Sequence, residues 1–334
     1  MIERKKSVLL AAVVLFSITI LTATPFIGMD RISLNDLINA GADTVKADIF
    51  WKIRLPRVLV AFLAGAGLSI SGMAFQAMFR NPLATPFTLG VSSGAAFGAI
   101  LYIKIGLIFS LLGLSGQLFV SFLGAVLSVA LVYGITRMRQ GFSTVTMLVA
   151  GVAINFFFSS LILFIQYISD FANSFRIIRW LMGGFEVVGF FPVKTILPFV
   201  LVGSFIIFYL VNELNLLTLG EDLAVSRGGD IKKIKLFLFL GTSLMVGGIV
   251  AICGPIGFVG MMAPHICRLF IGWNHRYLAP VSFLFGGTFL VLCDALARII
   301  IAPAEIPVGV ITALLGGPFF LWLLVRGSAE NLFS

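Results

Sequence analysis

Long apolar runs, separated by short polar connections, recur along almost the whole chain. A helix that crosses a bilayer needs about 20 apolar residues. On that measure the sequence predicts ten spans: Ser7 to Met29, Val58 to Phe79, Phe87 to Ile103, Leu118 to Thr136, Val145 to Ile168, Val193 to Val211, Leu236 to Ile252, Gly254 to Gly272, Leu278 to Cys293 and Val308 to Val325. The pattern predicts an all-α, polytopic membrane protein that forms a single domain over residues 1–334.

Composition supports a membrane protein, because 60% of the residues are hydrophobic and 11% are charged. That leaves too few polar groups to cover a soluble surface. The net charge is +9, but the basic residues are scattered between apolar runs. They form no basic face of the kind that binds nucleic acid, so we expect membrane lipid beside them and no nucleic-acid partner.

The N-terminal run predicts a retained first span rather than a cleaved signal peptide. It is longer than a signal-peptide core, and no small-residue cleavage site follows it. Arg4, Lys5 and Lys6 precede it, which by the positive-inside tendency places the N-terminus in the cytoplasm. An even number of spans places the C-terminus there too. Spans two to five and seven to ten would then have opposite topology, as inverted four-helix halves do.

Spans two and three are dense in small residues, which predicts close packing against other helices. These residues are Gly65, Gly67, Ser69, Ser71, Gly72, Gly90, Ser92, Ser93, Gly94, Ala95, Ala96 and Gly98. Span eight contains Pro255, Gly257, Gly260 and Pro264. Such residues interrupt a helix, and a bilayer tolerates unpaired backbone only inside protein or beside a watery cavity. We expect a broken helix in the interior of the bundle.

The segment from Leu214 to Lys235, between spans six and seven, is the longest strongly charged break in the chain. Thr218 and Glu221 form a capping-box pattern that predicts a helix start, and Gly228 and Gly229 predict its end. A helix this short is marginal alone in water, so it needs a docking partner. The alternative is a solvated cytoplasmic loop that merely joins two spans.

Basic residues also crowd the outer side, where Lys52, Arg54 and Arg57 precede span two and Arg298 follows span nine. Two interpretations stay open: contact with lipid headgroups, and an external basic patch that receives an acidic partner. Asp294 lies four residues before Arg298, so we expect these two side chains to neutralise each other.

The sequence contains no Walker phosphate-binding loop, so no nucleotide or other cofactor is expected in this chain. His265 and His275 lack partners at metal-ligand spacing, and no catalytic constellation indicates a membrane enzyme. The deep polar residues are the neutral Gln76, Asn155 and Gln166. Because ion-coupled carriers usually hold an acidic residue near mid-span, such coupling is disfavoured.

Several long motifs together resemble the FecCD-type permeases of type II ABC importers for ferric siderophores, haem and cobalamin. They are RLPR (Arg54 to Arg57), SGMAFQAMFRNPLATPFTLGVSSGAAFG (Ser71 to Gly98), LTLGEDLAVSRG, GPIGFVGMMAPHICRLF and EIPVGVITALLGGPFFLWLL (Glu305 to Leu324). The resemblance runs from about Ile53 to Val325 in consistent order.

The resemblance implies a permease in the cell inner membrane that pairs with a second copy of itself. Its other partners would be two cytoplasmic ATPase subunits, which bind ATP and Mg, and an extracytoplasmic substrate-binding protein. The charged segment would be the helix that couples to the ATPase, through Thr218, Leu219, Gly220, Glu221, Asp222, Leu223, Ala224, Arg227 and Gly228. The pore would be lined by spans five and ten and by a short helix within Phe171 to Phe185.

Three further assignments follow from the same resemblance. Arg54, Arg57 and Arg298 match the residues that dock the binding protein. Thr144 and Val145 match the inner gate, although Val145 replaces a small hydroxyl residue of the relatives. Asn155 and Gln166 are pore candidates because they are polar and deep.

A metal chelate is the expected cargo, with ferric siderophores first and haem or cobalamin next. An oxyanion such as molybdate is an alternative, and an ion-coupled secondary transporter is a rival from another class.

Overall fold

The computed structural model describes residues 2–28, 32–33, 37, 45–106, 109–111, 114–138, 143–220 and 230–326. The helices within them are α1 (Ile2–Ala23), the 3-10 turn η1 (Thr24–Phe26), α3 (Val45–Asp48), the π-helical η2 (Ile49–Arg54), α4 (Leu55–Phe79), α5 (Val91–Ile105), α6 (Gly116–Met138), α7 (Thr144–Tyr167), α8 (Phe171–Leu181), α9 (Phe191–Tyr209), α10 (Val211–Leu219), α12 (Ile231–Cys253), α13 (Val259–Ile271), α14 (His275–Ile299) and α15 (Val308–Arg326). Two short strands, β1 (Ser110–Leu111) and β2 (Leu114–Ser115), pair as an antiparallel hairpin. The all-α expectation is confirmed.

A helix occupies each of the ten positions where the sequence predicts a span. Seven helical segments are long and apolar enough to cross a bilayer: those containing α1, α4, α6, α7, α9, α12 and α14. The helices α5, α13 and α15 are apolar but shorter. The chain is therefore a polytopic membrane protein whose bundle includes helices of less than full length.

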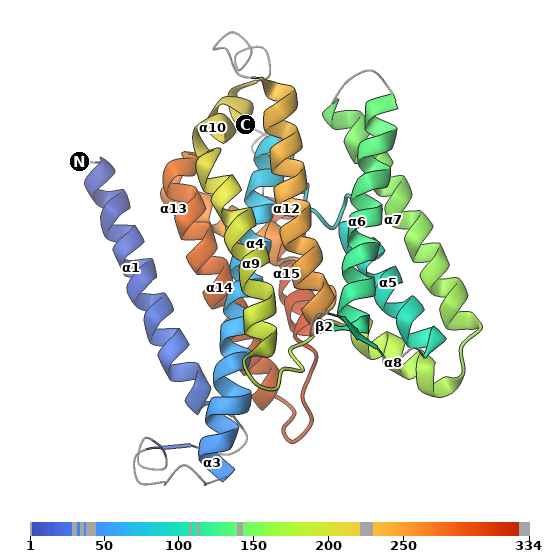
Figure 1. The fold of residues 1–334 in the computed structure, drawn as a ribbon. Coiled ribbons are helices and arrows are strands. Elements are labelled where there is room, and N and C mark those ends of the chain that lie inside the picture. The colour runs from blue at the N-terminus through green and yellow to red at the C-terminus, as the bar shows by residue number, and fades with distance from the viewer. Residues whose placement is uncertain are drawn as a thin grey trace.

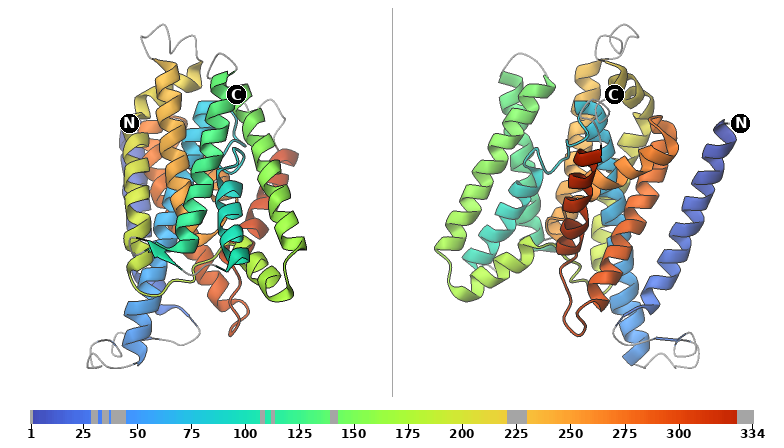
Figure 2. Two further views of the ribbon diagram at one scale, coloured as in Figure 1. Left: turned by 45° about the vertical axis from the view of Figure 1, so that its right-hand side comes forward. Right: turned by 180° about the vertical axis from the view of Figure 1, so that it is seen from behind.

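Helix α4 lies at the centre of the bundle, with α9, α12, α13 and α14 packed around it (Figures 1 and 2). Helix α5 joins α6 and α7 beside this group, and α1 lies at the periphery against α14. The starts of α1, α7 and α12 lie at one end of the bundle with α10, which we call the α10 end. The opposite end, which holds α3, α8 and the turn at residues 300–307, is the α8 end.

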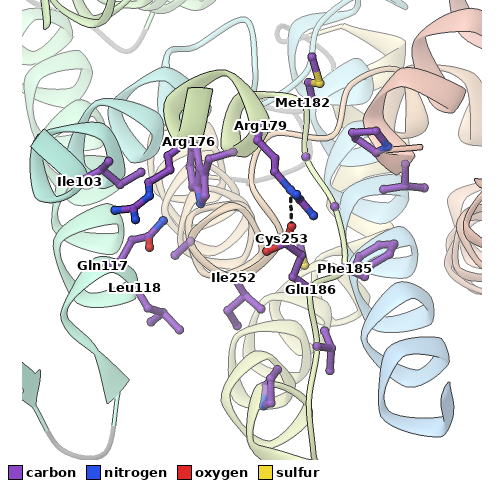
Figure 3. A pocket seen from close by; sticks show the side chains of 18 of the residues that line it. Ile103, Gln117, Leu118, Arg176, Arg179, Met182, Phe185, Glu186, Ile252 and Cys253 are labelled. Carbon is purple, nitrogen blue, oxygen red and sulfur yellow. Dashed lines mark hydrogen bonds and ion pairs between the residues drawn. The ribbon is translucent and has the colours of Figure 1, made fainter. Parts of the chain in front are cut away.

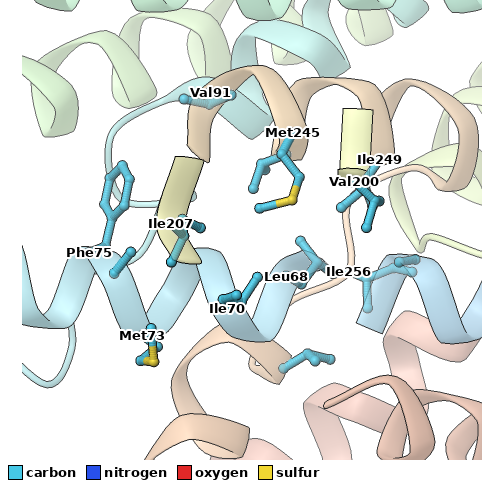
Figure 4. Close-up of a cluster of buried hydrophobic side chains, with 14 of the residues drawn as sticks. Leu68, Ile70, Met73, Phe75, Val91, Val200, Ile207, Met245, Ile249 and Ile256 are labelled. Carbon is cyan, nitrogen blue, oxygen red and sulfur yellow. The ribbon is translucent and has the colours of Figure 1, made fainter. Parts of the chain in front are cut away.

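The core is one apolar cluster that spreads outward from α4. Every residue from Ala64 to Phe79 is buried. In Figure 4 the side chain of Leu68 points toward Val200 of α9 and Ile249 of α12. Because α4 presents no face to lipid along this stretch, its sequence is apolar or small on all sides rather than amphipathic.

The small residues of spans two and three lie at close helix crossings, as expected. A Cβ on Gly72 would overlap the backbone carbonyl of Gly260 in α13, and one on Gly65 would overlap that of Gly286 in α14. Gly94 of α5 faces Gly124 of α6 in the same way. Since lipid tails gain nothing from glycine, these contacts show where backbones must approach each other.

Span eight is interrupted, as predicted, but the interruption precedes the helix instead of dividing it. Residues 254–258 form an irregular segment between α12 and α13, with φ of 68° at Gly254 and 67° at Phe258. Pro264 lies inside α13. The segment is enclosed by protein, because Gly254 and Ile256 are buried, which is the setting that non-helical backbone needs within a membrane.

The expected inverted halves correspond to α4 to α7 and α12 to α15. Helices α4 and α12 run in opposite directions (Figure 1), and each is followed by an irregular turn and a short helix, α5 or α13. Helix α13 packs on α4, and α5 packs on α12, so the short helix of each half contacts the long first helix of the other half. This arrangement agrees with an inverted duplication.

The segment from Leu214 to Lys235 differs from expectation at both ends. Leu214 to Leu219 belong to α10, and Ile231 to Lys235 begin α12, so helix extends into the segment from both sides. The prediction that Thr218 starts a helix is wrong: Thr218 lies in the last turn of α10, and its hydroxyl donates to the carbonyl of Asn215 at 2.8 Å. The apolar spacing of Val211, Leu214 and Leu217, all buried, continues helical structure to this point.

Replacing Gly72 with alanine should destabilise the bundle, because the new methyl group would overlap the backbone of Gly260. A backbone cannot move aside as a flexible side chain can. Overpacking of this kind costs about 1–3 kcal/mol. Thermal unfolding in detergent measures the effect. The control is Gly134→Ala on α6, where a Cβ meets nothing within 4 Å. Equal melting temperatures for the two variants would contradict the close α4–α13 contact.

Candidate functional site

A cavity of about 1150 Å³ opens at the α8 end. Its walls come from α8, from the ends of α5 and α12, from the starts of α6 and α15, and from residues 182–187 and 304–307. Figure 3 shows side chains from these elements converging on it. Segments far apart in the sequence therefore enclose one space that is large enough for a bulky ligand.

Helix α8 forms one wall, and its position follows from its sequence. Asp170 caps its N-terminus, where its carboxylate accepts hydrogen bonds from the Asn173 side chain at 2.6 Å and the Asn173 backbone at 3.4 Å. These bonds lower the pKa of Asp170, the side-chain bond contributing most. Ile177 is fully buried, and Trp180 packs with it against α5 and α7. The opposite face of α8, with Arg176 and Arg179, is left for the cavity.

The cavity wall is mostly apolar, with a few charged side chains. Its apolar residues include Ile103, Leu118, Phe175, Ile178, Phe185 and Ile252. Arg179 pairs with Glu186 at 2.7 Å, and Arg57 pairs with Glu305 at 2.7 Å. An apolar wall with a small number of polar groups is typical of a site that binds a ligand and fixes its orientation.

Backbone hydrogen bonds join three parts of this wall. The N–H of Gly184 donates to the carbonyl of Cys253 at 2.8 Å, and the N–H of Gly309 donates to the carbonyl of Gly183 at 3.3 Å. The residues after α8 are thus bonded to the end of α12 and to the start of α15. Glycine is needed for this approach, because a Cβ on Gly183 would overlap the Pro255 carbonyl and Gly183 has φ of 66°.

Beside the cavity lies an ion network, defined here as the largely buried Arg57, Asp294 and Arg298 together with the half-exposed Glu305. Asp294 contacts Arg57 at 2.9 Å and Arg298 at 3.2 Å. The expected pairing of Asp294 with Arg298 is confirmed. The sequence did not reveal Arg57 as a second partner, because it lies 237 residues from Asp294 along the chain. A buried carboxylate needs such partners, since desolvation of an unpaired charge is very costly.

The three arginines assigned to docking, Arg54, Arg57 and Arg298, are largely buried in the single chain. Arg54 and Arg298 are 7% and 6% exposed, and the side chain of Arg57 is 11% exposed. Arg54 donates to the carbonyls of Pro25 and Phe26 at 3.4 Å, and Arg298 donates to that of Ile27 at 2.9 Å. These contacts join the turn that follows α1 to η2 and to the end of α14, while Arg298 Nη2 has no hydrogen-bond partner among the described residues. Their role in docking a partner stays a prediction.

The residues assigned to the gate and the pore lie apart from this cavity. Thr144 is the first residue of α7, at the α10 end, and Val145 beside it is 67% exposed. Asn155 and Gln166 lie farther along α7, and neither lines the cavity. The backbone carbonyl of Gln166 accepts from Ser169 and Ser174 near the start of α8.

Only some of the residues assigned to ATPase coupling lie within the described part of the chain. Thr218 and Leu219 end α10, and Gly220 follows with φ of 128°. Glu221, Asp222, Leu223, Ala224, Arg227 and Gly228 lie outside the described residues. Helix α10 is fixed to α14, because Asn215 accepts from the backbone N–H of His275 at 2.9 Å. The segment after Gly220 thus leaves from a well-anchored helix at the α10 end.

The model of the FecCD transport family matches residues 9–326. The chain belongs to the FecCD transport family. The hemin transport system permease protein HmuU of Yersinia pestis is 36% identical, over 90% of this chain and 90% of the relative. The molybdate import system permease protein MolB of Haemophilus influenzae is 38% identical, over 95% of this chain and 98% of the relative.

A solved structure with the same fold is described as an inward-facing conformation of a metal-chelate type ABC transporter. It matches with a TM-score of 0.85 and 33% identity, over 96% of this chain and 99% of that chain. Family membership over nearly the whole length agrees with the resemblance seen in the motifs. It identifies the chain as a membrane permease of the ABC transporter type.

Apart from Arg57, the charged residues of the cavity were not singled out by reasoning from residue patterns. Arg176 and Arg179 lie three apart in a helix whose apolar residues are on the other side, and that amphipathic spacing is the signal that could have found them. Glu186 and Glu305 carry no comparable local signal. Their importance depends on contacts with Arg179 and Arg57 that only the fold creates.

Substituting Asp294 with alanine should strongly destabilise the protein, because Arg57 and Arg298 would lose their shared buried partner. Breaking a buried ion pair typically costs about 3–5 kcal/mol. The matched control is Glu305→Gln, whose side chain is 52% exposed, so we expect a loss of about 1 kcal/mol or less. Melting temperatures in detergent measure both, and similar shifts would contradict a central role for Asp294.

Proposed function

We propose that this chain is the permease subunit of an ATP-driven importer that moves a metal chelate across the cell inner membrane. The cavity of about 1150 Å³ at the α8 end supports this proposal most directly. Ligand pockets are commonly about 300–1,000 Å³, so a space of this size suits a bulky cargo. Its mostly apolar lining suits a large organic chelator better than a bare ion.

The energy for transport comes from a separate subunit in this proposal. The sequence lacks a Walker loop, so ATP and Mg would be bound by two cytoplasmic ATPase partners. The segment from Thr218 to Gly228 would contact them, including Leu219, Glu221, Asp222, Leu223, Ala224 and Arg227. The fixed position of α10 against α14 supports this role, because a rigid anchor transmits a push.

The remaining parts of the assembly follow from the same proposal. A second copy of the chain would complete the pore, with Asn155 and Gln166 of α7 toward the path. Thr144 and Val145 would border the inner gate, since the start of α7 lies at the α10 end. The N- and C-termini would both face the cytoplasm.

An extracytoplasmic binding protein would deliver the cargo at the α8 end. Arg54, Arg57 and Arg298 would contribute to docking, but their positive charges are already engaged within the chain. Acidic residues of the binding protein would therefore compete with Asp294 and Glu305 for them. Docking would then change the contacts of the ion network instead of filling an empty patch.

The cargo is most consistent with a chelate such as a ferric siderophore or haem, because HmuU is a hemin permease. Cobalamin would fit the same reasoning about size. A specific observation favours an oxyanion as a second candidate: MolB, a molybdate permease, is 38% identical over 95% of the chain. The permease fold alone does not separate these two classes of cargo.

Reconstitution into proteoliposomes with the cognate ATPase and binding protein tests the proposed function. We expect uptake of ferric chelate or haem that requires ATP, and that stops when the Walker lysine of the ATPase is replaced. Uptake should survive an ionophore that collapses proton and sodium gradients. The opposite result, with transport that ignores the ATPase and stops with the ionophore, would show a secondary carrier.

Replacing both Glu221 and Asp222 with lysine should uncouple ATP hydrolysis from uptake, because reversed charges would oppose docking on the ATPase. We expect uptake to fall about tenfold or more, a loss equivalent to about 1.4 kcal/mol of coupling. The comparison variant Glu221→Gln with Asp222→Asn keeps the shape and removes only the charge. Normal uptake per ATP in the lysine variant would count against this contact.

A further inference from the structure

One cationic side chain on the cavity wall stands out because its charge is not balanced within the described part of the chain. Three arginines line the cavity: Arg57, Arg176 and Arg179. Arg57 is paired with Asp294 and Glu305, and Arg179 is paired with Glu186. Among the described residues Arg176 has no ion-pair partner.

The carboxylates at the start of α8 and on the cavity wall contact other groups. Asp170, on the same helix, accepts hydrogen bonds from Asn173 at the helix start. Glu186 and Glu305 hold Arg179 and Arg57, each at 2.7 Å. Arg176 is exposed, and it adds one net positive charge to a largely apolar wall.

A second donor faces the same part of the cavity. Gln117 lies in the first turn of α6, across the cavity from α8, and Figure 3 shows its side chain and that of Arg176 directed toward the same space. Tyr102 and Ser115 line the cavity as well. A guanidinium group with an amide and hydroxyl groups provides several hydrogen-bond donors, which suits an acceptor-rich, negatively charged group.

The packing of α8 holds the backbone that carries Arg176, whose own side chain is exposed. The next residue, Ile177, is fully buried against α5 and α7, and α8 is capped at its start by Asp170. A guanidinium that is held on a rigid helix and left without a counter-ion is prepared for a ligand from outside the chain.

We propose that Arg176, assisted by Gln117, binds an oxyanion group, such as a carboxylate or phosphate, on the cargo as it enters the cavity. This inference rests on the proposed function and adds that the cargo is anionic. The same chemistry occurs in the headgroup of an anionic lipid, and we assign it to the cargo because Arg176 and Gln117 converge on the cavity.

Trp180 lines the same cavity and provides a built-in reporter. With Trp51, Trp273 and Trp322 replaced by phenylalanine, quenching of Trp180 fluorescence measures binding of a ferric chelate to the permease in phosphatidylcholine nanodiscs. The two probes are ferric citrate, which carries carboxylates, and an uncharged ferric trihydroxamate. Arg176→Gln is compared with the parent and with Arg176→Lys, which keeps the charge.

We expect Arg176→Gln to weaken ferric citrate binding about three- to tenfold, as loss of one partly solvated charge-assisted contact should. Arg176→Lys should retain part of the affinity, and binding of the trihydroxamate should not change. The matched control is Arg276→Gln, an exposed arginine on α14 at the α10 end, which should behave as the parent. An unchanged melting temperature for Arg176→Gln excludes misfolding as the cause.

Three results would overturn the inference: parent protein that does not bind ferric citrate, equal binding of ferric citrate by parent and Arg176→Gln, or equal loss for both probes. The lipid source is tested in nanodiscs that contain phosphatidylglycerol. If that lipid abolishes the difference between parent and Arg176→Gln, the lipid headgroup is the ligand and the assignment to cargo fails. These binding measurements need no ATPase. A negative result here is therefore distinguishable from a negative result in the uptake assay that tests the proposed function.

Discussion

The architecture depends on how closely the backbones around α4 can approach. Lipid tails are as apolar as leucine, so helices in a bilayer gain little from burying apolar surface and associate through tight packing. Gly65 and Gly72 bring α14 and α13 into direct contact with α4. This central helix in turn fixes where α9 and α12 lie, and with them the far walls of the cavity.

Charge imposes a second constraint at the α8 end. Asp294 is fully buried, and it is tolerable there because Arg57 and Arg298 approach it from two helices. Glu305, at the turn before α15, extends this network to the cavity wall. Packing thus holds the middle of the bundle together, while paired charges hold its end, where the cargo is proposed to enter.

Sequence patterns predicted the bundle well, because apolar run length and small residues report directly on burial in a membrane. They located a helix at every expected span and the close packing near Gly72 and Gly94. They failed where the outcome depends on distant contacts. The burial of Arg57 depends on a carboxylate 237 residues away, and Thr218 resembles a helix start although the buried face of α10 reaches Leu217. Helix α8 was expected only through family resemblance.

The main-chain bonds from Gly184 to Cys253 and from Gly309 to Gly183 carry a mechanical consequence. They join the exit of α8 to two other helices without using any side chain. A tilt of α8 would therefore move the end of α12 and the start of α15 together. Because both bonds use main-chain atoms only, substitutions of the lining side chains leave their donors and acceptors in place, and the connection can persist while the chemistry of the surrounding wall diverges.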